Sequence, residues 1–161
     1  MSLGLKNTLD RGFALTTIAI YFTGIAIWIT ASVLTAILHY QCWKTLPQGY
    51  RSTTPGKAVG FLFLPLFNFY WTFKSHVGLA GGYRKFGETN NVEIGNSKGL
   101  AIAYAASGIA DILLFLIPLA NCIPPLVHGI LFYFYYQNIV KYAKKTIRTQ
   151  SSIDDISSEQ V

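Results

Sequence analysis

With 161 residues, the chain has room for one domain of ordinary size. Hydrophobic residues make up 52% of it and charged residues only 12%, which is far from the composition of a soluble globular protein. The net charge of +6 would favour nucleic acid in a soluble protein, but the basic residues flank apolar runs, where lipid headgroups attract them, so nucleic acid is not an expected partner.

Two long apolar runs predict an integral membrane protein. No charged residue occurs from Gly12 to Trp43, and from Gly99 to Val140 the only one is Asp111. Uncharged apolar runs of about 18 residues or more are typical of transmembrane helices. The run over residues 13–40 is longer than the apolar region of a signal peptide, so we expect it to remain as an anchor.

The first helix is expected over about 13–40, after a short polar lead. Small residues recur along it at spacings of three and four, which places them on one stripe. Small residues let helices approach closely in lipid, and threonine hydroxyls can bond to carbonyls of their own helix, so packing is favoured over lining a pore. We call this stripe the small-residue seam; it consists of Thr16, Ala19, Thr23, Ala26 and Thr30.

Three further helices are expected, over about 57–81, 99–120 and 125–142. The second holds Pro65, a predicted kink, and the pair Gly81-Gly82 is expected to end it. The sequence PLANCIPP at 118–125 predicts a tight hairpin between the third and fourth helices. Residues 1–148 then form one transmembrane domain, and 149–161 a flexible polar tail.

The predicted fold class is therefore all-α, an integral membrane four-helix bundle. Four alternating spans place the N-terminus, loop 83–98 and the C-terminus on one side with nine basic residues, against three on the other side. By the positive-inside rule both termini are expected in the cytoplasm. The nine are Lys6, Arg11, Arg84, Lys85, Lys98, Lys141, Lys144, Lys145 and Arg148, and the three are Lys44, Arg51 and Lys57.

Asp111 is the sharpest candidate for a functional residue. It lies about 18 Å into the third helix, near the bilayer midplane, on one face with Ser107. Intramembrane carboxylates often act as proton relays, ion ligands or counter-charges, although a buried aspartate can also simply fix helix packing. Depth along the second helix favours Asn68 as its partner, while Lys74 and His76 are expected to reach toward the cytoplasmic interface.

The cysteines and histidines allow two further hypotheses. Cys42 and Cys122 are predicted on the same outer side, where a disulfide could join the first helix to the hairpin, with two free thiols as the alternative. A metal site from His39, Cys42, Cys122 and His128 is not expected, because these residues come from separate segments.

Basic residues follow the aromatic stretch 132–136 and favour anionic lipid headgroups on the cytoplasmic side. They are Lys141, Lys144, Lys145 and Arg148. No nucleotide loop, metalloprotease motif, hydrolase elbow or carboxylate pair occurs in the sequence, so we expect neither catalysis nor a cofactor.

The segment over residues 54–73, TPGKAVGFLFLPLFNFYWTF, resembles a segment of bacterial multi-pass membrane proteins that are grouped as domains of unknown function. The shared pattern is TPGKAVGFxFxPxFNxYW. The resemblance implies a small protein of the bacterial inner membrane, and it implies no activity.

Two functions remain open from the sequence. The first is a non-catalytic accessory or structural subunit that packs against other membrane proteins or against itself. The alternative is a small transporter or channel element with a polar path around Asp111 and Asn68, to which Lys74 and His76 could contribute.

Overall fold

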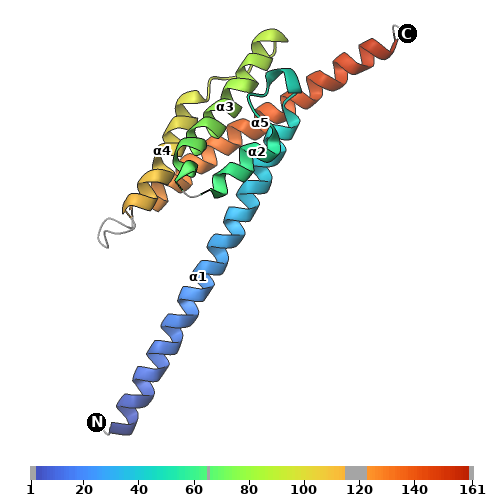
Figure 1. The fold of residues 1–161 in the computed structure, drawn as a ribbon. Coiled ribbons are helices and arrows are strands. Elements are labelled where there is room, and N and C mark those ends of the chain that lie inside the picture. Colours follow the sequence, from blue (N-terminus) through green and yellow to red (C-terminus); the bar gives the residue numbers. More distant parts are fainter. Residues whose placement is uncertain (1–2, 65, 115–122, 160–161) are drawn as a thin grey trace. The chain divides into compact units, whose positions relative to one another are not determined.

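The computed structural model describes residues 3–64, 66–114 and 123–159. In these residues the regular elements are five α-helices and two short 3-10 helices, with no strand, so the all-α prediction is confirmed. The chain divides into two compact units, Met1–Leu38 and His39–Val161. Figure 1 shows α3, α4 and α5 side by side in the second unit.

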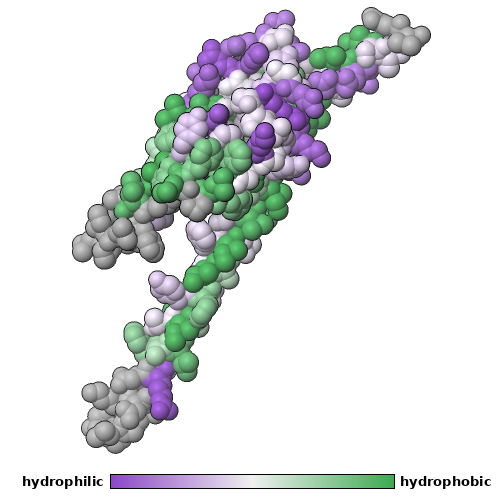
Figure 2. Space-filling model, viewed as in Figure 1, coloured by the Kyte–Doolittle hydropathy of each residue, from purple (hydrophilic) through white to green (hydrophobic). Residues whose placement is uncertain are grey.

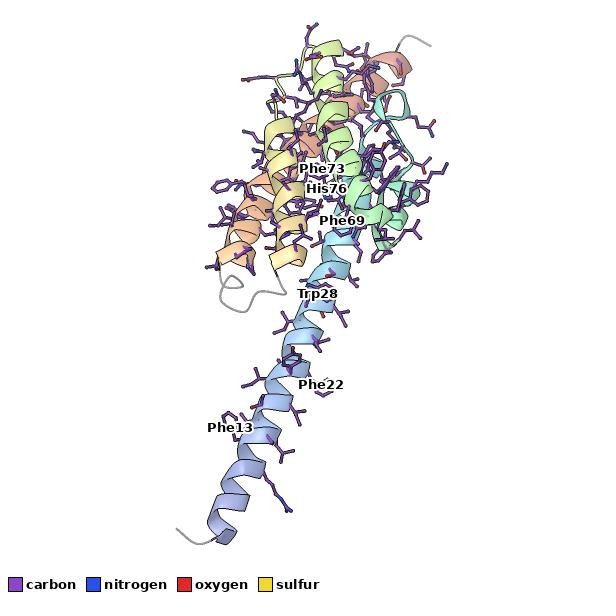
Figure 3. The ribbon with its side chains drawn as sticks, turned by 60° about the vertical axis from the view of Figure 1, so that its left-hand side comes forward. Phe13, Phe22, Trp28, Phe69, Phe73 and His76 are labelled. Carbon is purple, nitrogen blue, oxygen red and sulfur yellow. The ribbon has the colours of Figure 1, made fainter. Side chains whose placement is uncertain are left out.

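Helix α1, Leu3–Thr45, is longer than expected, and its residues up to Leu38 form the first unit by themselves. Figure 3 shows side chains such as Phe13, Phe22 and Trp28 projecting from this helix, and no other element of its own unit covers them. Among the described helices, only the stretch Arg11–Thr45 is long and apolar enough to cross a membrane. Such a helix fits a single span or an N-terminal signal sequence.

The small-residue seam of α1 satisfies its own polar groups, as the sequence predicts. The Thr16 hydroxyl donates to the carbonyl of Gly12 at 2.9 Å, and the Thr23 hydroxyl donates to that of Ala19 at 2.8 Å. Thr30 makes the same bond to Ala26 at 2.8 Å. The seam therefore presents methyl groups and small side chains, with no hydroxyl that requires water.

The prediction of a single helix over 57–81 is wrong, because the chain forms two α-helices and a 3-10 turn in this region. Helix α2, Pro55–Gly60, is capped by Thr54, and a 3-10 turn follows at Phe61–Phe63. Helix α3, Phe67–Thr89, begins after Leu66, which has a φ of 63° that L residues rarely adopt. The predicted kink at Pro65 lies outside the described residues.

Helix α3 also passes through Gly81-Gly82 instead of ending there. A Cβ at Gly82 would lie 2.4 Å from a methyl of Leu46 and 2.8 Å from the carbonyl oxygen of Tyr50. The glycine therefore permits close contact with a neighbouring segment. In the sequence, the glycine pair indicates only a tendency to end a helix, and not this role inside one.

Helices α4, Lys98–Leu114, and α5, Ile123–Glu159, replace the spans expected over 99–120 and 125–142. The hairpin between them falls on residues 115–122, outside the described part, and stays a prediction. Residues up to Glu159 are helical where a tail was expected from 149 onward. The reason is that no glycine or proline follows Gly129, so nothing in the polar sequence stops the helix.

The helix directions differ from those of four alternating spans. His39 meets Ser75, and further along the backbone of Cys42 meets Tyr83, so the end of α1 runs parallel to α3. Residues 46–64 return alongside α3, and α4 runs antiparallel to α3 and α5. As a result, Tyr50 lies against Asn90, on the same end of the bundle as the start of α4.

The core of the second unit is aromatic. Its largest fully buried side chains include Trp43, Tyr83, Phe86 and Tyr135. Burial raises the pKa of the Tyr83 phenol above its ordinary value, so the hydroxyl stays protonated and donates to the carbonyl of Cys42 at 2.6 Å. The buried hydroxyls of Tyr83 and Tyr135 thus each have a backbone partner on another helix, Cys42 and His76 respectively.

The two ends of the bundle differ in polarity. Figure 2 shows hydrophobic residues where α4 ends and α5 begins, and hydrophilic residues at the opposite end. The apolar end exposes large side chains from α4 and α5, namely Leu113, Leu126, Val127, Ile130, Tyr133 and Phe134. The opposite end, which we call the basic end, carries Lys44, Arg51, Arg84, Lys85, Lys98, Lys141, Lys144, Lys145 and Arg148.

We expect Gly82→Ala to destabilise the second unit by about 1–3 kcal/mol, because the added methyl would overlap the backbone of Tyr50. Gly129→Ala is the matched control, since its Cβ would meet nothing within 4 Å, and we expect it to be neutral or stabilising by up to about 1 kcal/mol. Thermal unfolding of both variants in the same detergent, followed by circular dichroism, measures the difference. Equal stability of the two variants would contradict the close contact at Gly82.

Candidate functional site: a row of histidines in the bundle

All three histidines of the chain lie in one row, although they come from three helices. The rings of His39, from the end of α1, and His76, from α3, have centroids 4.4 Å apart. Tyr104 of α4 continues the row, 5.0 Å from the ring of His76 and 4.8 Å from that of His128 on α5. We call these four residues the histidine row.

His39 is held by three side chains. Its Nε2 lies 2.7 Å from the Ser75 hydroxyl and accepts from the indole N–H of Trp43 at 3.2 Å. Because an indole nitrogen can only donate, the Nε2 of His39 carries no proton. The proton is therefore on Nδ1, which lies 3.1 Å from the hydroxyl of Tyr136, and the ring is neutral.

His76 is buried, with only 5% of its surface exposed, so the expectation that it reaches toward the membrane interface is wrong. Its Nδ1 donates to the carbonyl of Thr72 at 2.8 Å, and Figure 3 shows the ring within the bundle. Lys74 is exposed, with its ammonium 5.1 Å from the centre of the Trp71 ring. Residues that are two positions apart on a helix lie on nearly opposite faces, which explains why Lys74 is exposed while His76 is buried.

Asp111 lies beside His128, and its expected pairing with Asn68 is wrong. An oxygen of Asp111 is 3.8 Å from Nδ1 of His128, and Ser107 is 2.8 Å from that same nitrogen. The amide oxygen of Asn68 instead accepts from Thr72 in its own helix at 2.7 Å. The other oxygen of Asp111 is buried with no hydrogen-bond partner among the described residues.

The grouping of Asp111 with Ser107 on one helix face is confirmed, but this face lies at the rim of the bundle. The side chain of Asp111 is 24% exposed and that of His128 is 30% exposed. The carboxylate therefore meets a partly exposed imidazole at 3.8 Å, which is beyond hydrogen-bond distance, in place of the Asn68 amide that depth alone suggested.

The predicted disulfide cannot be followed to its second residue. Cys42 is buried in the core, while Cys122 lies outside the described residues, so this pairing stays a prediction. Over the described ranges, no group of three or more histidine, cysteine or acidic side chains is arranged to hold a metal ion. His39 and His76 meet at a tilt of 30°, and His128 stacks on Tyr104 rather than on either of them, whereas shared coordination requires ring nitrogens that converge on one point.

Four residues of this site escaped the sequence analysis: His39 as a core residue, and the tyrosines Tyr104, Tyr135 and Tyr136. Tyr135 donates its hydroxyl to the carbonyl of His76 at 3.1 Å, so it braces α5 against α3. A signal was present, because a histidine inside an apolar run requires a buried partner and tyrosines recur in the apolar helices of this chain. Nothing in a single sequence pairs particular members of the two sets.

The predicted headgroup residues share one face of α5. Lys141, Lys144, Lys145 and Arg148 form no ion pair with any carboxylate in the described part of the chain. The ammonium of Lys145 donates to the backbone carbonyl of Glu93 at 2.5 Å. Three cations are therefore left on the surface of α5 without an anionic partner there.

Comparison with protein families, with characterised proteins and with solved structures finds no match for this chain. The resemblance of residues 54–73 to bacterial multi-pass membrane proteins thus stays a prediction.

We expect His39→Leu to lower the free energy of unfolding by roughly 2–4 kcal/mol, because it leaves the Trp43 indole and the Tyr136 hydroxyl buried without their partner. In a Trp43→Phe background the same change should cost about 1 kcal/mol less, since no indole N–H remains to be left unpaired. Urea unfolding of the four proteins of this double-mutant cycle measures the coupling. Equal cost of His39→Leu in both backgrounds would show that Trp43 and His39 are not bonded.

Proposed function

We propose that this protein is a membrane-anchored, non-catalytic accessory subunit, held by α1 and by insertion of the apolar end of the helical bundle into the bilayer. The observation that carries the proposal is the separation of apolar and basic residues along the bundle. A soluble bundle gains nothing from exposing large apolar side chains at one end, whereas a bilayer covers that end and places the basic end at the headgroups.

The helix directions support a topology with fewer crossings than the sequence suggested. Lys44 and Arg51 lie on the basic end together with the start of α4 and the lysines of α5, so the positive-inside rule assigns this end to the cytoplasm. Helix α1 reaches this end at its C-terminus. If α1 crosses the bilayer once, the N-terminus lies on the opposite side from the C-terminus, in place of two cytoplasmic termini.

The histidine row supports a structural role over a catalytic one. The ring nitrogens of His39 are used by Trp43, Ser75 and Tyr136, and Nδ1 of His76 is used by a backbone carbonyl. Groups that act as bases or nucleophiles need a free lone pair directed at substrate. Here the bonds instead join the end of α1 to α3 and α5.

The accessory role rests on α1. Its residues 3–38 lie in a unit with no other helix in it, and its seam has internally satisfied hydroxyls. Close packing through small residues is the main way by which helices associate in lipid. The seam therefore suits a helix of another membrane protein or of a second copy.

The alternative, a transport element around Asp111, is favoured by one observation. A buried carboxylate oxygen without a hydrogen-bond partner among the described residues lies next to His128 and Ser107, which resembles the start of a proton or cation path. Asn68 and Lys74 do not extend this path, because they bond or stack within α3. The accessory role is therefore preferred.

We expect the termini to label on opposite sides of the membrane. In a background with Cys42→Ala and Cys122→Ser, a cysteine at Thr8→Cys should react with a membrane-impermeant maleimide added to intact spheroplasts. A cysteine at Ser158→Cys should react only after lysis. Labelling of both positions on intact spheroplasts, or of neither position before lysis, would contradict the single crossing and support an even number of spans.

We expect Ala26→Leu, in the seam, to weaken the association of α1 with its partner helix by about tenfold, because a larger side chain separates the two backbones. Ala14→Leu is the matched control, since the helical period places it on the opposite face of α1. Mild-detergent purification of each tagged full-length protein, with quantification of stoichiometric partners and of its own oligomers, measures the effect. A lone monomer that conducts ions in liposomes, and loses this conduction with Asp111→Asn, would support the transport alternative instead.

A further inference from the structure

One face of α5 holds a groove of about 610 Å³ that changes character along its length. Two adjacent ridges of residues spaced by four border it, as on any helix surface. The first ridge begins with Phe132 and Tyr136 and ends with Lys144 and Arg148, and the second runs from Tyr133 to Lys141 and Lys145. The groove is therefore aromatic where it begins and basic where it ends.

The basic half of the groove carries positive charge that no described carboxylate neutralises. Lys141, Lys144 and Arg148 lie within two helical turns and pair with no described carboxylate, since the one ion pair of a described lysine or arginine joins Arg84 to Glu88. Like charges three and four residues apart on a helix repel each other. An anion bound between these three side chains would remove this repulsion.

The aromatic half of the groove indicates that its ligand has an apolar part in addition to an anionic group. Phe132, Tyr133 and Tyr136 border the groove, and exposed apolar side chains continue the same end of α5 back to Leu126. From Leu126 to Val140 the helix rises about 21 Å, at 1.5 Å per residue. This length is close to the hydrocarbon depth of one leaflet, about 15 Å, plus the start of the headgroup region.

We propose that this groove binds one anionic phospholipid, with its phosphate among Lys141, Lys144 and Arg148 and one acyl chain along Phe132 and Tyr133. The inference rests on the proposed membrane function, because it requires the apolar end of α5 to lie in the bilayer. An inorganic phosphate or a nucleic acid would use the basic half alone and leave the aromatic half exposed. A zwitterionic lipid would fill the aromatic half and bring no net negative charge to the basic half.

The test is a competition for the full-length protein in detergent with equimolar phosphatidylglycerol and phosphatidylcholine, read by native mass spectrometry. We expect one retained phosphatidylglycerol per chain, preferred over phosphatidylcholine by about tenfold or more. The triple change Lys141→Gln, Lys144→Gln, Arg148→Gln should remove this preference. The matched control Lys44→Gln, Lys85→Gln, Lys98→Gln removes the same charge from the basic end outside the groove and should leave the preference intact.

Three results would overturn the inference: equal retention of both lipids, equal loss of preference in the control triple variant, or displacement of phosphatidylglycerol by free glycerol phosphate. A separate measurement distinguishes failure of the lipid site from failure of the proposed membrane function. Insertion of the wild-type protein into vesicles of phosphatidylcholine alone, resistant to alkaline carbonate, supports the membrane function whatever the lipid preference. Failure to insert would overturn both the membrane function and the lipid site.

Discussion

The buried hydrogen bonds around His39 and Ser75 are the constraint on which the second unit depends. Ser75 lies 2.7 Å from the unprotonated Nε2 of His39 and 3.1 Å from the carbonyl oxygen of Ala58, so its one hydroxyl proton lies between two acceptors, while His39 also meets Tyr136. Four segments, the end of α1, α2, α3 and α5, thus meet at two polar side chains. In an aromatic core each of these groups would cost free energy if left unpaired, so the segments can only pack in the arrangement that pairs them all.

This arrangement decides the direction of the helices, and the direction decides where the charges lie. Because α1 ends parallel to α3, residues 46–64 must run back along α3 before it begins. They approach it closely at Gly82, and Trp71 donates its indole N–H to Ala58 on the returning segment at 3.0 Å. The return brings Arg51 to the same end as the lysines of α5, which creates one basic end where alternating spans would have divided the charge.

Hydropathy and periodicity predicted the parts of this fold that depend on local sequence. The long apolar α1, the internal bonds of its threonines and the shared face of Ser107 and Asp111 all follow from spacing alone. The direction of α3 relative to the other helices does not follow from spacing, because an apolar run has the same length in either direction. The extension of α5 through a polar sequence was missed for a different reason: composition argued for disorder, whereas the absence of glycine and proline permits a helix. The partners of His39 and Asp111 required three-dimensional placement, since both partners come from helices that are distant in sequence.

The histidine row also explains why buried histidines can support an apolar core without introducing charge. A protonated His39 would stand 4.4 Å from the ring of His76 and would have to donate from both nitrogens. The indole of Trp43 occupies one nitrogen as a donor, so protonation would require this bond to break inside the core. Trp43 therefore selects the neutral ring of His39, and along the row His76 meets Tyr104 edge to face while His128 stacks on Tyr104. The histidine row thus acts as a rigid joint, and Asp111 meets the last histidine of the row, His128, at the rim of the bundle.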